Sequence, residues 1–282
     1  MNELMKEPLK IYFKSIDHIF DGYYDDLNLF RVVHVCENVP YDRSRVFHTP
    51  YNMRSRVSSS RYSIAGYPSL YLGTSLELCC DEVGLDPFSS FGLAAKYKFE
   101  RDISNNHTEI SVIELSVKPQ DFLDNQYDSN KPRQFKRHFR LVNNGVNLRN
   151  VESTYLIWYP LIASASYIRT NKSHPFAAEY IIPQLLMQWI RNSMSVAIDN
   201  NANVNDKLIG IRYFSCASNI ASEKGFNYVF PTSGQKSEND SRFCPILVKA
   251  FRMTKPVYIN EYSSVQECED ALIRSSDLKY VI

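Results

Sequence analysis

The chain has 282 residues, of which 44% are hydrophobic and 22% charged, and this ordinary balance excludes a wholly disordered protein. Its 32 basic and 31 acidic side chains nearly cancel, which argues against a surface built to bind nucleic-acid phosphates. No stretch approaches the roughly 18 uninterrupted apolar residues of a membrane span, and the first residues lack the apolar core of a secretory signal. The six cysteines form no C-x-x-C pair, so we expect a reduced, cytoplasmic protein without zinc.

Two predicted strands flank an irregular arm near the start of the chain. Branched and aromatic side chains predict a strand at residues 29–35, and a turn at residues 66–68 precedes a short buried strand at residues 69–73. The arm, residues 41–62, holds one acid and five arginines: Arg43, Arg45, Arg54, Arg56 and Arg61. Because a guanidinium matches phosphate oxygens and keeps its charge, the arm is either a diphosphate receptor or a solvated basic loop.

A short helix is predicted directly after the second strand. Thr74 and Glu77 have the spacing of a capping box, so we expect a helix from Ser75 to about Val83, closed by the following glycine. Glu82 lies near its C-terminal end, where the helix dipole disfavours a negative charge. Taken alone, Glu82 is most simply a surface residue.

The remaining chain predicts more strands than helices. Strands are expected at residues 92–99, 110–117, 207–215 and 226–230, and residues 246–259 would form one further strand or two. Helices are expected at residues 154–168, which would be buried, at residues 184–192, opened by Pro183, and at residues 264–274. Residues 119–150 are mostly polar. Since strands and helices do not alternate regularly, the order favours an α+β domain with a mixed or antiparallel sheet over a doubly wound parallel one.

Familiar catalytic motifs are absent from the sequence. It contains no G-x-G-x-x-G, no G-x-x-x-x-G-K-[ST], no H-E-x-x-H and no G-x-S-x-G. With nine glycines, the chain shows no loop that could wrap a phosphate through backbone amides, so side chains would have to recognise it. The histidines show no metal-ligand spacing, and no metal is expected.

One block of sequence suggests a particular family. It runs Arg61-Tyr-Ser-Ile-Ala-Gly-Tyr-Pro-Ser-Leu-Tyr-Leu-Gly-Thr-Ser-Leu-Glu-Leu-Cys-Cys-Asp-Glu-Val83 and resembles the RES-domain family, named for an arginine, a glutamate and a serine. Three further stretches resemble that family: Leu29-Phe-Arg31-Val its opening strand, Glu179-Tyr-Ile-Ile-Pro-Gln184 the lead-in of longer members, and Gly210-Ile-Arg-Tyr-Phe-Ser215 with Asn227-Tyr-Val-Phe230 its late strands. The matches extend from about residue 29 to residue 231.

The resemblance implies a fold and a domain organisation. The fold would be ADP-ribosyltransferase-like, an α+β split mixed or antiparallel β-sheet with flanking helices and a cleft for NAD. A catalytic domain would span residues 29–245, with an insertion around residues 119–150. Residues 1–28 would form an N-terminal extension, and residues 246–282 a strand and helix packed on the same domain.

The resemblance also assigns roles to five residues. Glu82 and Ser215 would be catalytic, Glu82 facing the nicotinamide ribose and Ser215 fixing its orientation. Arg31 and Arg61 would bind the diphosphate, and Tyr71 would stack on the nicotinamide or line the ribose pocket. NAD would be the substrate, cleaved at the nicotinamide–ribose bond without a metal.

The acceptor of the ADP-ribose group stays open between water, phosphate and a protein side chain. Compact members of the family are toxins that usually act beside a neutralising antitoxin. That pattern does not establish that this longer chain is a toxin or has an antitoxin partner, so both stay open.

Two other interpretations stay open. Residues 131–140 interleave five basic side chains with Phe135 and Phe139, a pattern that can hold a nucleic-acid backbone and stack bases. The near-zero net charge and the lack of a nucleic-acid module argue against this alternative, a nucleic-acid-binding or nuclease-like protein, and a solvated loop is the simpler interpretation. The chain could also keep the fold as a catalytically inactive binding module.

Overall fold

The computed structural model describes residues 27–36, 40–86, 91–100, 109–116, 118, 148–169, 176–199, 207–217, 221–233 and 242–281. The strands are β1 (Leu29–His34), β2 (Ser69–Gly73), β3 (Gly92–Phe99), β4 (Glu109–Leu115), β5 (Lys207–Phe214), β6 (Phe226–Pro231), β7 (Phe251–Met253) and β8 (Val257–Tyr258). The α-helices are α2 (Leu76–Val83), α5 (Leu148–Ser166), α6 (Ile181–Asp199), α7 (Pro245–Ala250) and α8 (Val265–Arg274). Short 3-10 helices are η1 (Arg43–Val46), η2 (Tyr51–Arg56), η3 (Ala178–Tyr180), η4 (Ala221–Glu223) and η5 (Ile259–Glu261).

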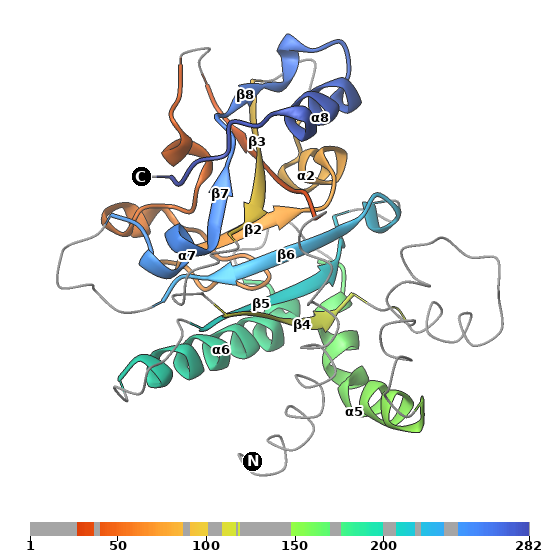
Figure 1. The fold of residues 1–282 in the computed structure, drawn as a ribbon. Coiled ribbons are helices and arrows are strands. Elements are labelled where there is room, and N and C mark those ends of the chain that lie inside the picture. Colours follow the sequence, from red (N-terminus) through yellow and green to blue (C-terminus); the bar gives the residue numbers. More distant parts are fainter. Residues whose placement is uncertain are drawn as a thin grey trace.

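The described strands form one mixed sheet in the order β4-β5-β6-β2-β1-β3-β7, with β8 paired to β3 (Figure 1). Strands β4 and β5 are parallel and the other neighbours antiparallel. This confirms the predicted α+β class with a mixed sheet. Strands at residues 29–35, 69–73, 92–99, 110–117, 207–215 and 226–230 were each predicted within a residue or two of their bounds.

The sheet is curled, and its two parts meet at a narrow junction. Strand β1 pairs with β2 through one registered pair, Phe30 with Gly73, whereas β1 and β3 share six pairs and β2 and β6 share five. In Figure 1, β3 and β7 run steeply while β2, β6 and β5 run across the view. The two parts therefore diverge between β1 and β2.

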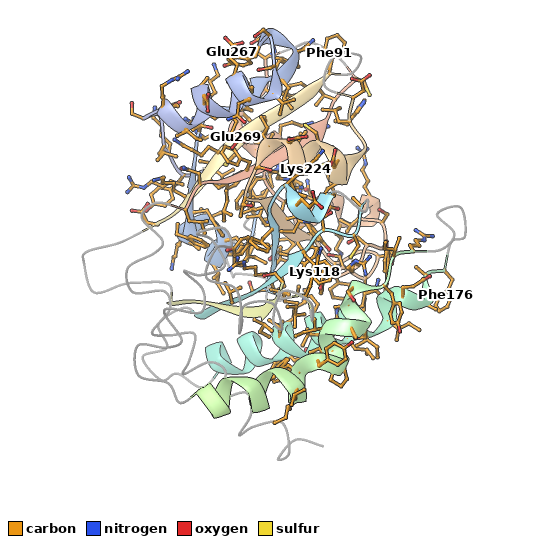
Figure 2. All side chains as sticks on the ribbon, turned by 90° about the vertical axis from the view of Figure 1, so that its right-hand side faces the viewer. Phe91, Lys118, Phe176, Lys224, Glu267 and Glu269 are labelled. Carbon is orange, nitrogen blue, oxygen red and sulfur yellow. The ribbon has the colours of Figure 1, made fainter. Side chains whose placement is uncertain are left out.

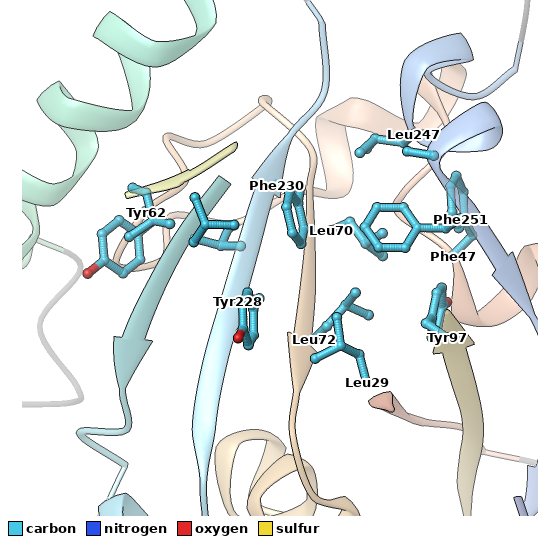
Figure 3. Packing of buried hydrophobic residues seen from close by; sticks show 14 of the residues in the cluster. Leu29, Phe47, Tyr62, Leu70, Leu72, Tyr97, Tyr228, Phe230, Leu247 and Phe251 are labelled. Atoms are coloured by element: carbon cyan, nitrogen blue, oxygen red, sulfur yellow. The ribbon is translucent and has the colours of Figure 1, made fainter. Parts of the chain in front are cut away.

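Side chains of β1 alternate between two hydrophobic clusters, as the two-residue period of a strand requires. Leu29 belongs to the main cluster, where Leu70, Phe230 and Phe251 pack together (Figure 3). Phe30 and Val32 belong to a second cluster beneath α2 and α8. Both faces of β1 are thus covered, which fixes α2 against the strand beside the junction.

Helix α2 begins one residue later than the capping box predicts. Its N-cap is Ser75, whose Oγ accepts a hydrogen bond from the backbone N of Leu78 at 3.2 Å. Thr74 instead remains tied to β6, because its Oγ1 accepts from the backbone N of Phe226 at 2.9 Å. Gly84 closes the helix as predicted, in the left-handed conformation with φ 63°.

One strand prediction and two helix predictions also need correction. Residues 246–250 belong to α7 rather than to a strand, because Pro245 opens a helix that buries Ile246, Leu247 and Ala250 on one face. Helix α6 begins at residue 181, two residues before Pro183, and runs to residue 199. Helix α5 runs from residue 148 to residue 166, and its part from residue 156 onwards is not buried throughout: Leu156 is 68% exposed, whereas Trp158 is 4% exposed.

The last predicted helix, residues 264–274, is confirmed as α8 with Ser264 as its N-cap. Most of the polar stretch at residues 119–150, with its basic run at residues 131–140, lies outside the described residues. None of the helices in the described ranges combines the length and apolar character needed to cross a membrane.

Candidate active site

A cavity of about 620 Å³ opens where β1 and β2 diverge. Its walls come from β1, β2, the C-terminal half of α2, the turn at residues 60–61 and the segments that follow α5 and β5. The volume falls within the range of roughly 300–1,000 Å³ that is usual for sites that bind small molecules and cofactors.

The cavity gathers residues that are far apart in the sequence. Arg31, Arg61, Tyr71 and Glu82 all line it. Ser215 hydrogen-bonds to Glu82, and the two residues after Ser215 lie in the cavity wall. The tertiary structure therefore brings all five residues singled out in the sequence to one place.

The carboxylate of Glu82 receives two side-chain hydrogen bonds on one oxygen. Its Oε1 accepts from Ser215 Oγ at 2.6 Å and from Asn227 Nδ2 at 2.5 Å. Both donor residues are buried, at 3% and 4% exposure, while Glu82 itself is exposed. Such charge-assisted bonds offset the unfavourable position of Glu82 at the C-terminal end of α2 and orient its carboxylate.

Ser215 can act only as a donor to Glu82. Its Oγ also accepts a hydrogen bond from the backbone N of Ala217 at 3.1 Å. A hydroxyl has one proton, and this contact leaves that proton for the carboxylate. The residue follows directly after β5, so the end of that strand determines where the hydroxyl lies.

Asn227 is a site residue that the sequence analysis did not single out. It lies on β6, in register with Gly73 of β2 and Tyr213 of β5. A side chain at Gly73 would collide with the sulfur of Cys79, 2.7 Å from a Cβ built there, and would lie 3.5 Å from Asn227 Oδ1. The sequence pointed to Asn227 in one way: it is the single amide side chain in the otherwise apolar strand Phe226–Pro231.

Arg31 keeps a buried donor in the cavity wall. Its Nη1 donates to the backbone O of Tyr71 at 3.1 Å, whereas its buried Nε has no hydrogen-bond partner. Burial lowers the pKa of this guanidinium, yet an arginine remains protonated near neutral pH. As a cation in the cavity wall, Arg31 is suited to an anionic ligand.

A second group of arginines lies beside Tyr180. The guanidinium carbon of Arg61 is 5.2 Å from the centre of the Tyr180 ring, and that of Arg169 is 5.7 Å from it. Arg61 Nη1 also donates to the backbone O of Ala165, near the end of α5, at 2.8 Å. Tyr180 and both arginines line the cavity, whose wall therefore holds three arginines, with Arg31, against two acids, Asp81 and Glu82.

The Tyr71 hydroxyl is already engaged. It lies 2.7 Å from Ser60 Oγ and 2.8 Å from Ser63 Oγ. Burial raises the pKa of Tyr71, so the phenol is neutral at physiological pH. Its ring is therefore the part that a ligand would meet.

Two other wall residues limit the chemistry. Burial raises the pKa of the Cys216 thiol, which makes this cysteine a poor nucleophile. Burial likewise raises the pKa of Tyr213 well above its ordinary value. Among the described residues, no three histidine, cysteine or acidic side chains gather as metal ligands.

The Arg-rich arm is not a single diphosphate receptor. Arg43 pairs with Asp277 at 2.6 Å and donates to the backbone O of Met253, and Arg45 donates to the backbone O of His34. Of the five arginines of the arm, Arg61 alone lines the cavity, so that interpretation is wrong for Arg43 and Arg45.

Lys224 anchors the helix that carries Glu82. The residue lies beside α2 (Figure 2), and its Nζ is 2.8 Å from Glu77 Oε1 and 2.6 Å from Asp81 Oδ2. The backbone O of Lys224 also accepts from Ser75 Oγ, the N-cap of the helix. The connection before β6 thus holds α2 at both ends.

Fold and site together define a mixed α+β protein with a cavity that holds three arginines and one carboxylate oriented by two side-chain donors. Over 237 residues the chain is 26% identical to a protein of Bacillus subtilis (strain 168) named "Putative toxin YopC". The alignment covers 82% of this chain and 46% of that relative, so the chain spans about half of the relative's length. No family model matches the chain. No solved structure matches it either.

Proposed function

We propose that this chain is an NAD-consuming enzyme of the ADP-ribosyltransferase-like class, which cleaves the bond between nicotinamide and ribose. The observation that carries the proposal is the Glu82 carboxylate, oriented by Ser215 and Asn227 in the same cavity as Arg31 and Arg61. An anionic dinucleotide requires cations for its diphosphate, and cleavage of its glycosidic bond requires a negative group beside the ribose. The cavity offers both.

Binding would rest on the arginines. The guanidinium groups of Arg31 and Arg61, both in the cavity wall, can donate to the diphosphate oxygens, and arginine is suited to this because of its planar fork of donors. The ring of Tyr71 would contact the nicotinamide or its ribose. Resemblance to the RES-domain family supports the same assignment of residues.

The chemical step would rest on Glu82. As nicotinamide leaves, positive charge develops on the ribose, and a fixed carboxylate lowers the energy of that transition state. Ser215 and Asn227 hold the carboxylate in one orientation before the substrate arrives, so little reorganisation is needed during the reaction. Glu82 could also remove a proton from the acceptor.

The acceptor gives the reaction its name. Water would make the chain an NAD glycohydrolase, phosphate an NAD phosphorylase, and a protein side chain an ADP-ribosyltransferase. The toxin name of the Bacillus subtilis relative supports a toxin role for this chain, through loss of NAD or modification of a target. A neutralising antitoxin and a cytoplasmic location remain predictions from the sequence.

The experiment is direct. Purified protein is incubated with NAD, and free nicotinamide is measured by chromatography. Parallel reactions in water alone, with phosphate and with cell lysate identify the acceptor from the form in which ADP-ribose appears. Failure to release nicotinamide in all three would refute the proposal.

A further inference from the structure

We infer that Gln184, which lies outside the cavity wall, is a positioning residue that holds the turn carrying Arg61. The part of this inference that concerns NAD rests on the proposed function. The hydrogen bonds by which Gln184 holds the turn, called the clamp below, can be tested separately by hydrogen exchange. Its basis is a set of side-chain hydrogen bonds that joins α6, the turn at residues 60–63 and β2.

The turn is closed by its own backbone. Ser60 N donates to Ser63 O at 2.8 Å, and Ser63 N donates to Ser60 O at 3.2 Å. The two residues between them diverge: Arg61 lines the cavity, whereas Tyr62 is fully buried, with its ring centre 4.7 Å from that of Tyr213. The position of this turn therefore decides where the Arg61 guanidinium lies.

The side-chain amide of Gln184 lies against both closing carbonyls. Its Nε2 donates to Ser60 O and to Ser59 Oγ, each at 2.8 Å, and lies 3.3 Å from Ser63 O, so its two protons are shared among three acceptors. Backbone carbonyls can only accept hydrogen bonds, so the NH₂ end of the amide must face the turn. Helix α6, whose first turn contains Pro183, thus holds the turn from one side.

The hydroxyl of Tyr71 holds the same turn through its serine side chains. Ser63 Oγ donates to Ser69 Oγ at 3.0 Å, which uses the single proton of that serine. The Tyr71 hydroxyl must then donate to Ser63 Oγ and accept from Ser60 Oγ. Gln184 therefore holds the backbone carbonyls of the turn while Tyr71 holds its serine hydroxyls, and Gln184 influences Arg61 without lining the cavity itself.

Two substitutions separate the donor role from mere packing. Gln184→Ala removes the amide, and Gln184→Glu keeps the shape but places an acceptor against two carbonyl oxygens. Gln188→Ala, one turn later on α6 and similarly half-buried, is the matched control. Wild type and variants are compared by hydrogen exchange at the Ser60 and Ser63 amides and by calorimetric titration with NAD.

Both Gln184 variants should exchange these two amides about tenfold faster or more, while protection of β3 stays unchanged. The Kd for NAD should rise about tenfold in Gln184→Ala and at least as much in Gln184→Glu. Gln188→Ala should match wild type in both measurements.

Unchanged exchange at Ser60 and Ser63 in both Gln184 variants would overturn the clamp. A rise in exchange without loss of NAD affinity would overturn the positioning role for Arg61. If wild type binds no NAD while the variants still exchange faster, the proposed function fails and the clamp stands.

Discussion

Ser215 Oγ donates a hydrogen bond of 2.6 Å to Glu82 Oε1 across 133 residues of sequence. The bond joins the end of β5 to the end of α2, two of the elements that border the cavity. Asn227 reaches the same oxygen from β6. The two hydrogen bonds to this one carboxylate oxygen therefore depend on the relative positions of α2, β5 and β6.

Replacing Glu82 by Gln should preserve the fold, because the amide oxygen can still accept from both donors. NAD cleavage should fall by about 10²-fold or more, the scale expected for a lost electrostatic or acid–base group. Nicotinamide release under saturating NAD measures the effect. Undiminished turnover in a folded Glu82→Gln protein would remove this residue from the mechanism.

Ser215→Ala and Asn227→Ala should each lower turnover about tenfold, since each removes one donor from a charged acceptor. Their effects should not be additive, because both donors serve the same oxygen. A double-mutant cycle on the cleavage rate tests this, with Asn192→Ala, an exposed position on α6, as control. Fully additive effects would mean that the two side chains act independently of Glu82.

Arg61→Ala should mainly weaken NAD binding. Loss of a charged hydrogen-bond donor to the diphosphate should raise the Kd by about 10- to 100-fold. Arg56→Ala is the matched control, because Arg56 is an exposed arginine of the same arm. Equal affinities of wild type and Arg61→Ala by calorimetry would refute the role.

His48 should make the protein less stable in acid. Burial lowers the pKa of His48 from 6.5 to about 4, and the neutral ring contacts Thr49 O through Nδ1 and accepts from the backbone N of Cys244 through Nε2. The unfolded chain then binds a proton that the folded chain does not. The contribution is present in full above pH 6.5 and is lost as pH falls towards 4, about 3 kcal/mol in total.

Urea unfolding at pH 7 and pH 4.5 measures that loss. His48→Gln should show a smaller difference between the two pH values than wild type, whereas His34→Gln, at an exposed histidine, should match wild type. An identical pH dependence in wild type and His48→Gln would show that other groups control acid stability.

Lys96→Met should destabilise the packing of α8. The Nζ of this buried lysine on β3 donates to the backbone O of Ile273 and of Ser275, both at 2.9 Å. These carbonyls lie at the C-terminal end of α8, where a cation is favourable. Loss of the two hydrogen bonds from Lys96 should therefore lower the free energy of unfolding by about 1–3 kcal/mol. Thermal unfolding tests this against Lys255→Met, an exposed lysine that should leave Tm unchanged.

Local patterns in the sequence predicted most elements but not every boundary. The turn at residues 66–68 and the short apolar run after it marked β2 correctly, and the left-handed Gly84 closed α2 as expected. The capping box failed at Thr74 because β6 engages that hydroxyl, a contact with a residue 152 positions away. Residues 246–250 were misassigned because a short apolar run fits a strand and a buried helix equally well.

The sequence by itself determined the α+β class, the order of the strands along the chain and the residues worth placing in one site. Those are properties of local periodicity, turn chemistry and a family resemblance. The tertiary structure alone decided that Arg61 enters the cavity while Arg43 pairs with Asp277, and that Asn227 joins Ser215 on Glu82. The physical reason is that these contacts depend on the register and splay of β1, β2, β5 and β6, which long-range pairing sets and no local pattern encodes.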